Sequence, residues 1–265
     1  MTTPEFLERP DGRLAYDVTG DGPPLLLVTG LGGSRRYWAN VVPELARTFT
    51  VITHDHMGIG DSKGSRAAHT VQALTDDVVA LMDHLGIPQA NLLGHSTGAA
   101  VGQMLAQDYP QRLLKLVLSA GWAGPDPYFE LCFEARKELL MGSGVAAYQR
   151  STALFLYPPS WISADAARLE ALMAGFTAAT PPADVLAARI DMIVAFDRRL
   201  RQQDIATPTL VICAEDDQLT PMHLSEELAA SIPHAQLARL AWGGHASSQT
   251  APDEFLSSVL EFLRS

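Results

Sequence analysis

Cysteine is scarce in this sequence, and that scarcity excludes two kinds of site. Cys132 and Cys213 are the two cysteines among 265 residues, too few for a framework of disulfide bonds. No Cys-x-x-Cys pair or Cys/His cluster indicates zinc. His54 and His56, which flank Asp55, lie too close together at one strand end to enclose a metal ion, so packing is the favoured interpretation. We therefore expect no metal and no cofactor.

Basic residues are also in short supply. Nineteen Lys and Arg stand against thirty Asp and Glu, which gives a net charge of −11. A negative field of this size repels phosphate backbones and anionic lipids. We therefore expect neither nucleic acid nor membrane as a partner, and a small-molecule substrate as the ligand.

Long apolar runs are missing as well. No stretch approaches the roughly 18 consecutive apolar residues that a membrane-spanning helix needs. The segment Met1–Glu5 lacks the basic patch and apolar run of a signal peptide. The sequence therefore predicts a cytoplasmic protein. We expect it to be a monomer or a homodimer.

What the sequence does contain is an alternation of strand and helix patterns. Apolar residues make up 47% of the chain, enough for a large core. Short apolar runs predict strands and three- and four-residue apolar spacings predict helices. We expect strands at 5–9, 13–18, 25–28, 49–53, 90–93 and 114–119, with helices near 37–45, 71–85 and 97–108. This alternation predicts an α/β fold with a mostly parallel, doubly wound sheet.

The pattern changes between residues 121 and 203, where helical spacings replace strand runs. The alternation then resumes with strands at 209–213 and 236–240 and helices at 221–231 and 252–263. We therefore expect one α/β core, formed by residues 1–120 and 204–265, with a helical lid at 121–203 inserted after the sixth strand. Open α/β sheets bind ligands at the carboxyl ends of their strands, so the lid should cover the pocket.

A serine flanked by glycines is the candidate nucleophile. Gly94-His95-Ser96-Thr97-Gly98 matches Gly-x-Ser-x-Gly and stands between a predicted strand and a predicted helix. In that context the serine occupies a strained turn that exposes its hydroxyl above the sheet edge, and the glycines make room for the strand and helix. The alternative, a loop serine that only caps the helix, is less consistent with this context.

A serine nucleophile needs a base and an acid that orients it. In the chain order Ser, Asp/Glu, His, the base should follow the last strand, where two glycines precede His245. The acid should follow the strand at 209–213, where Glu215, Asp216 and Asp217 are available. We favour Asp217 over Asp216, because it stands four residues before the helix-starting Pro221 and so lies at the loop tip.

Acyl transfer also requires donors for the developing oxyanion. One is the N–H of Thr97, which follows the nucleophile, and we expect the second from Leu31 in the glycine-rich segment 29–33. Gly30 in the same segment is expected to lie against the substrate. A phosphate cradle is excluded, because the segment lacks the P-loop lysine and the G-x-G-x-x-G spacing.

These motifs together resemble the α/β-hydrolase family. The resemblance rests on Gly30–Gly33, Asp55–Ser62, Gly94–Gly98, Asp217 with Pro221, and Gly244-His245. It implies an α/β-hydrolase fold and a hydrolase with a Ser-Asp-His triad made of Ser96, Asp217 and His245. The chain departs from the family at Met57, where an arginine is usual, and this departure bears on the packing of that loop.

A narrower resemblance includes the lid. Residues 132–140, 154–161 and 212–217 are similar to the aminoacrylate (carbamate) hydrolases of bacterial pyrimidine degradation. The 3-oxoadipate enol-lactonase-like esterases share the Gly-Leu-Gly loop and come next. The resemblance implies hydrolysis of a small ester, lactone, carbamate or enamine-type substrate through an acyl-enzyme on Ser96.

Other functions of this fold are excluded or stay open. Haloalkane dehalogenases and epoxide hydrolases need Asp at the elbow, so Ser96 excludes both. Perhydrolases and carbon–carbon bond hydrolases keep a serine triad, and so does a ligand-sensing protein that signals by lid movement. These three functions therefore stay open.

Three lid residues are candidates for substrate binding. Trp122 and Tyr157 are aromatic candidates for the pocket wall, although packing within the lid is the commoner role of such residues. Arg136 is a candidate partner for a carboxylate-bearing substrate, although a solvated helix face is the favoured interpretation.

Overall fold

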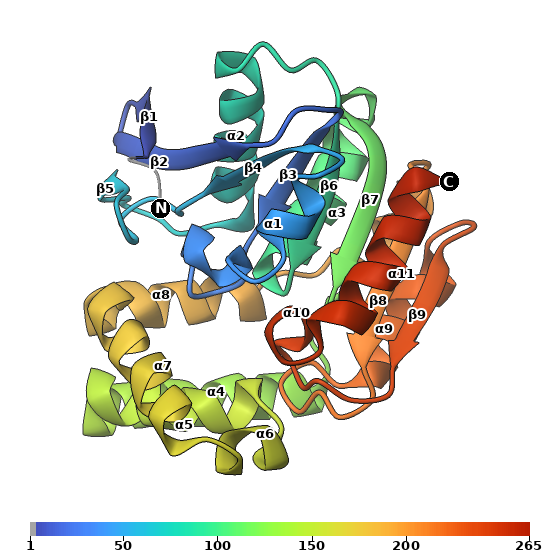
Figure 1. The fold of residues 1–265 in the computed structure, drawn as a ribbon. Coiled ribbons are helices and arrows are strands. Elements are labelled where there is room, and N and C mark those ends of the chain that lie inside the picture. The colour runs from blue at the N-terminus through green and yellow to red at the C-terminus, as the bar shows by residue number, and fades with distance from the viewer. Residues whose placement is uncertain (1–3) are drawn as a thin grey trace.

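The strands form a single sheet. The computed structural model describes residues 4–265, apart from the side chains of 177–179. Within these residues a nine-stranded sheet has the order β1-β2-β4-β3-β6-β7-β8-β9, and β5 pairs with β2 (Figure 1). The strands are β1 (Glu5–Arg9), β2 (Gly12–Thr19), β3 (Pro24–Val28), β4 (Thr50–His54), β5 (Lys63–Gly64), β6 (Ala90–His95), β7 (Leu113–Ser119), β8 (Thr209–Ala214) and β9 (Gln236–Leu240).

The central strands run parallel, as the sequence predicts. β2 pairs antiparallel with β1, β4 and β5, whereas every pair from β4 through β3, β6, β7 and β8 to β9 is parallel. All residues of β6 and β8 are buried, which explains why these strands show no alternation of apolar and polar residues. Parallel strands bring their carboxyl ends to one edge, so the loops after β3, β6, β7 and β8 meet there.

Helices cover both faces of the sheet. One apolar core lies between the sheet and α2 (Val71–His84), α3 (Thr97–Asp108) and α9 (Met222–Ser231). A second core lies between the other face and η1 (Arg35–Trp38), α1 (Val42–Leu45) and α11 (Pro252–Arg264). The short helices η2 (Pro110–Arg112) and α10 (Ser247–Thr250) complete the core. This is the doubly wound arrangement that the alternation predicts.

The chain between β7 and β8 is helical. It contains α4 (Pro127–Ser143), α5 (Val145–Leu156), α6 (Pro159–Ser163), α7 (Ala166–Ala179), α8 (Ala183–Val194) and η3 (Arg199–Asp204). We call residues 121–203 the helical segment. Figure 1 shows α4–α8 grouped below the sheet, with α8 nearest to it. Among the described residues, none of the helices combines the length and hydrophobicity required to cross a lipid bilayer.

The local differences from the predicted elements are small. The helix expected near 37–45 is divided into η1 and α1, and Pro43 lies in the first turn of α1, where a proline favours a new start. β5 and α10 were not predicted. β5 has two exposed residues and α10 is a single turn, so neither carries an apolar repeat.

Candidate active site

Ser96 lies in a strained turn between β6 and α3. Its backbone has φ 55° and ψ −114°, a conformation that side-chain-bearing residues rarely adopt. A Cβ on Gly94 would overlap the Gly98 carbonyl, and a Cβ on Gly98 would overlap the Val28 carbonyl. Both glycines are therefore required for close packing of the turn against α3 and β3. The serine is 5% exposed, at the carboxyl edge of the sheet.

Asp217 and His245 are in direct contact. His245 Nδ1 lies 2.9 Å from Asp217 Oδ2, and both side chains are buried. The other carboxylate oxygen accepts hydrogen bonds from the backbone N–H groups of Leu219 (2.8 Å) and Thr220 (3.0 Å). These bonds fix the carboxylate, which in turn can hold the imidazole with its proton on Nδ1 and leave Nε2 free to act as a base.

The neighbouring acid, Asp216, has a different contact. Its Oδ1 accepts a hydrogen bond of 2.8 Å from the N–H of Gly244, so it shapes the backbone just before His245. Thr220 was not identified from the sequence. Its hydroxyl lies 3.0 Å from Asp217 Oδ2 and 3.1 Å from His245 Nδ1, and no spacing signal in the sequence marks it.

His95 packs directly against His245. Their ring centroids are 4.7 Å apart, and His95 also stacks on Tyr37, with ring centroids 4.6 Å apart and an interplanar angle of 9°. Tyr37 Oη accepts a hydrogen bond of 3.0 Å from Ser248. The elbow residue just before Ser96 therefore supports the imidazole from one side.

The glycine-rich loop comes close to the nucleophile. A Cβ on Gly30 would lie 3.1 Å from Ser96 Cβ. The N–H of Gly33 donates to the Gly30 carbonyl at 3.0 Å and closes a tight turn, which we call the oxyanion loop (residues 30–33). Thr97 begins α3, so its N–H has no acceptor within the helix. Thr97 directly follows Ser96 in the chain, and Leu31 follows Gly30, the loop residue that lies against Ser96.

The loop after β4 is braced by an arginine from another part of the chain. Asp55 accepts hydrogen bonds from Arg35, through the backbone N–H at 2.7 Å and through the guanidinium, and from the Asp61 N–H at 2.9 Å. Met57, where the family usually has arginine, is buried. Arg35 therefore supplies the positive charge that this loop needs.

Three buried histidines predict loss of stability in acid. Burial lowers the pKa of His54, and it lowers those of His56 and His95 well below the ordinary value. The unfolded chain therefore binds more protons than the folded protein once the pH falls below about 6.5, so stability is full above that pH and declines below it. We expect each of these histidines to contribute at most about 1.4 kcal/mol per pH unit to the decline.

Denaturant titrations between pH 7.5 and 5 measure this slope. His95→Gln should reduce the slope of unfolding free energy against pH by the contribution of one histidine. The same change at the exposed His234 should leave the slope unaltered. An equal slope in wild type and His95→Gln would contradict the expectation.

Arg136 is buried, and the interpretation as part of a solvated helix face is wrong. Its side chain is 3% exposed, and Nη2 donates to Tyr148 Oη (2.7 Å) and Thr152 Oγ1 (3.2 Å). The guanidinium also lies over the rings of Phe133, Tyr148 and Phe155. This burial arises because α4 packs against both α5 and α8. Nε and Nη1 have no hydrogen-bond partner among the described residues.

The two aromatic candidates occupy different surroundings. Trp122 follows β7, is fully buried, and packs against Phe129 with ring centroids 4.8 Å apart. Tyr157 ends α5, stacks on Trp161 at 4.7 Å, and donates to Gln249 Oε1 at 2.9 Å. Tyr157 therefore contacts α10, which follows His245 closely in the chain.

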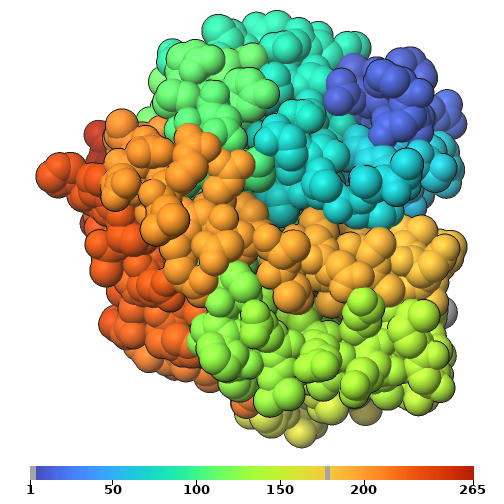
Figure 2. All heavy atoms as spheres, turned by 180° about the vertical axis from the view of Figure 1, so that it is seen from behind, coloured from blue at the N-terminus to red at the C-terminus, as the bar shows by residue number. Residues whose placement is uncertain are grey.

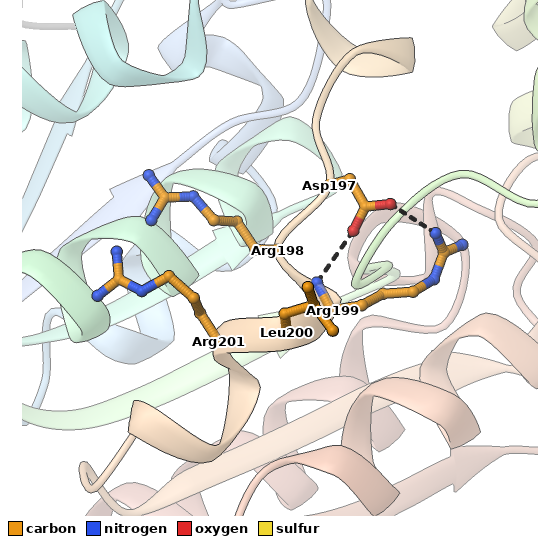
Figure 3. Close-up of a pocket in the computed structure, with 5 residues that line it drawn as sticks. All are labelled: Asp197, Arg198, Arg199, Leu200 and Arg201. Carbon is orange, nitrogen blue, oxygen red and sulfur yellow. Dashed lines mark hydrogen bonds and ion pairs between the residues drawn. The ribbon is translucent and has the colours of Figure 1, made fainter.

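No metal site is found among residues 4–265. No group of three or more His, Cys, Asp or Glu side chains could hold an ion there, and both cysteines are free. A surface hollow of about 420 Å³ lies elsewhere, along residues 197–201 (Figure 3). Arg199 pairs there with Asp197, and two further arginines pair with Asp108, at the end of α3 opposite to Ser96. These cations are neutralised, and the hollow is remote from the candidate triad.

Comparison with known proteins agrees with this geometry. Residues 23–252 match the family model of the α/β-hydrolase fold. The chain belongs to the α/β-hydrolase family. It is 41% identical to RutD of Caulobacter vibrioides, named as a candidate carbamate hydrolase, over 94% of this chain and 95% of that one. A RutD of Pseudomonas savastanoi, given the same name, is 41% identical over 92% and 94% of the two chains.

Solved α/β-hydrolases have the same fold over their whole length. A hydrolase from Pseudomonas aeruginosa superposes with a TM-score of 0.90 and 30% identity, covering 99% of this chain and 98% of that one. The enol-lactonase of Burkholderia xenovorans also gives a TM-score of 0.90, with 26% identity and coverage of 98% and 100%. The two groups that the sequence resembles within the family are therefore both among its relatives.

Proposed function

We propose that this α/β-hydrolase is a serine hydrolase that cleaves a small ester, lactone or carbamate through an acyl-enzyme on Ser96. The observation that carries the proposal is the 2.9 Å contact between His245 Nδ1 and Asp217 Oδ2, at the edge of the sheet where Ser96 occupies its strained turn. A buried, fixed imidazole of this kind is what a serine nucleophile requires.

Each residue has one role in the proposed reaction. His245 takes the proton of Ser96 as the hydroxyl oxygen attacks the carbonyl carbon, and it returns that proton to the leaving group. Asp217 keeps the imidazole oriented and stabilises its protonated form. The N–H groups of Leu31 and Thr97 donate to the oxyanion that forms on the carbonyl oxygen. Water then repeats the sequence with His245 as base and releases the acid product.

Carbamates are the substrates that the comparisons support first. The chain is about 40% identical to relatives named as candidate carbamate hydrolases over more than nine-tenths of both chains. An enol-lactonase-like esterase is the second candidate, supported by the full-length superposition on the Burkholderia xenovorans enzyme. Both reactions use the same attack by Ser96 on a carbonyl carbon.

In this proposal the helical segment (residues 121–203) acts as a lid. Trp122 and Tyr157 form apolar wall beside the acyl group, and Gly30 lets the substrate approach Ser96. Arg136 is a candidate partner for a substrate carboxylate, because two of its buried nitrogens have no protein partner among the described residues. Exclusion of water by such a lid strengthens every electrostatic contact within the site.

Tyr157 offers a direct test of the wall. Tyr157→Ala should shift the preference among acetyl to octanoyl p-nitrophenyl esters toward longer chains, because it removes the ring. Tyr157→Phe keeps the ring and loses only the hydrogen bond to Gln249, so its preference should stay near wild type. Unchanged selectivity in Tyr157→Ala would show that the ring only packs against Trp161.

Two measurements test the proposed function itself. A panel of short p-nitrophenyl esters, lactones and carbamates should show steady turnover, and a fluorophosphonate should label Ser96. A ligand-sensing protein would label without steady turnover. A perhydrolase or a carbon–carbon bond hydrolase would react faster with its own class of substrate than with any ester or carbamate of the panel.

A further inference from the structure

One arginine of α8 is buried against the oxyanion loop. Arg189 is 1% exposed and forms no ion pair with an acidic residue in the part of the chain that the structure describes. Figure 1 shows α8 between the sheet and α4, and in Figure 2 its gold atoms lie between the green atoms of α4 and the blue-green atoms that follow β4. A buried cation without a counter-ion is unfavourable unless its donors are satisfied in another way.

The donors of Arg189 are used to hold the oxyanion loop. Nε and Nη2 donate to the Leu31 carbonyl at 3.2 and 2.7 Å. Nη2 also lies 2.9 Å from Nδ1 of His56, whose backbone N–H donates to the Gly33 carbonyl at 2.8 Å. Burial, together with the nearby Arg189, lowers the pKa of His56, so its ring is neutral and can accept this bond. Arg189 therefore binds Leu31 directly and Gly33 through His56.

These contacts fix the direction of one N–H group. The Gly30 carbonyl and the Leu31 N–H belong to one rigid peptide plane, and that plane is held by the bond from Gly33 N–H to the Gly30 carbonyl. The next plane carries the Leu31 carbonyl, and Arg189 holds it. Both planes that meet at the Leu31 Cα are thus restrained. Gly33 itself has φ 69°, and a Cβ there would lie 3.0 Å from Arg189 Nη2, so the loop fits closely around the guanidinium.

We propose that Arg189 is a positioning residue that aligns the Leu31 N–H for the transition state, so that the helical segment takes part in the chemical step as well as covering the site. This inference rests on the serine-hydrolase function proposed above. A donor that is already aligned needs no reorganisation when the oxyanion forms, so loss of that alignment lowers kcat. Arg189 contacts the oxyanion loop and His56, and in this proposal it does not contact the substrate, so KM should change little.

The positive charge of Arg189 also favours the transition state. Burial lowers its pKa to about 10, with Tyr148 opposing and Arg66 adding to the shift, so the guanidinium stays protonated at neutral pH. His56 is the other titratable group in contact with it, and that ring is neutral. A fixed positive charge beside the oxyanion loop favours negative charge on the substrate oxygen.

Arg189→Met and Arg189→Lys, with Arg112→Met as the matched control, test the inference. Arg112 also donates to two backbone carbonyls, those of Ile87 (3.0 Å) and Pro88 (2.9 Å), but this loop precedes β6 and so lies at the sheet edge opposite to Ser96. Each variant is assayed for kcat, KM, the rate of fluorophosphonate labelling at Ser96, and thermal stability.

We expect kcat and the labelling rate of Arg189→Met to fall together by roughly 10- to 100-fold, with KM within about threefold, since outright loss of an oxyanion donor costs about 10²–10³-fold. Arg189→Lys retains one donor group and the charge, so its rates should lie between those of wild type and Arg189→Met. Arg112→Met should react at the wild-type rate.

Several results would overturn the inference. If folded Arg189→Met keeps the wild-type labelling rate and kcat, Arg189 is only a packing residue. A change in KM alone would lead to the same conclusion. If Arg189→Met does not fold, Arg189→Lys decides the question, and a wild-type labelling rate in that variant contradicts the proposed role. Absence of labelling in the wild-type protein would instead refute the proposed serine-hydrolase function.

Discussion

Replacing Ser96 with alanine is expected to abolish hydrolysis. The hydroxyl oxygen is the atom that would form the acyl-enzyme, and alanine has no nucleophilic atom in its place. Loss of a serine nucleophile lowers kcat by roughly 10⁴-fold or more. Alanine tolerates the same positive φ to a similar degree, so the fold and its thermal stability should be retained. Turnover of the ester panel and fluorophosphonate labelling measure the effect.

A serine far from the site provides the control for this experiment. Ser258 lies on α11, where its hydroxyl donates to the Glu254 carbonyl. Ser258→Ala should turn over and label like the wild type. Labelling or normal turnover in Ser96→Ala would show that the nucleophile lies elsewhere and that the elbow has a structural role.

Asp217→Asn should produce the second largest loss. An asparagine oxygen can still accept the N–H groups of Leu219 and Thr220, so the loop should keep its shape. The amide nitrogen then faces His245 Nδ1 as a donor and selects the wrong tautomer of the imidazole. A change of this kind lowers kcat by about 10⁴-fold in a serine triad. The measurement is kcat on the best substrate of the panel, together with thermal stability.

The neighbouring carboxylate supplies a matched comparison. In Asp216→Asn the side-chain oxygen can still accept the hydrogen bond from Gly244 N–H, so we expect a loss of at most about tenfold. If Asp216→Asn were the more damaging change, the orienting acid would have to be reassigned. Equal losses would indicate that both variants act through the shape of the loop.

The proposed mechanism connects three distant parts of the chain at one edge of the sheet. The elbow supplies Ser96, the loop after β8 supplies Asp217, and the loop after β9 supplies His245. The helical segment reaches the last of these loops and also the loop after β3. Its Arg189 holds Leu31, and the Leu156 carbonyl accepts a hydrogen bond of 3.0 Å from the N–H of Ala246, the residue after His245. If the helical segment acts as the proposed lid, these attachments are expected to make it affect rate as well as substrate size.

Much of the fold could be predicted because its signals are local. Runs such as 25–28 and 210–213 are apolar throughout because strands in the middle of a parallel sheet are buried on both faces. The apolar spacing of residues 71–85 predicts α2 for an equally local reason. Elements that bury little apolar surface carry no such signal. The sequence does not predict β5 or α10, and it predicts one helix near 37–45 where the structure has two.

The sequence by itself determined the candidate nucleophile, base and acid, because Ser96, Asp217 and His245 each follow a strand and stand among glycines or turn residues that leave a local pattern. Only the tertiary structure decided what surrounds them. Arg189 and Leu31 are 158 residues apart, and no periodicity brings them together. The solvated helix face considered for Arg136 is wrong, because packing of α4 against α5 and α8 buries the side chain. A local pattern reports the conformation of its own segment, whereas burial and long-range hydrogen bonds depend on which segments pack against it, and that is settled only when the whole chain has folded.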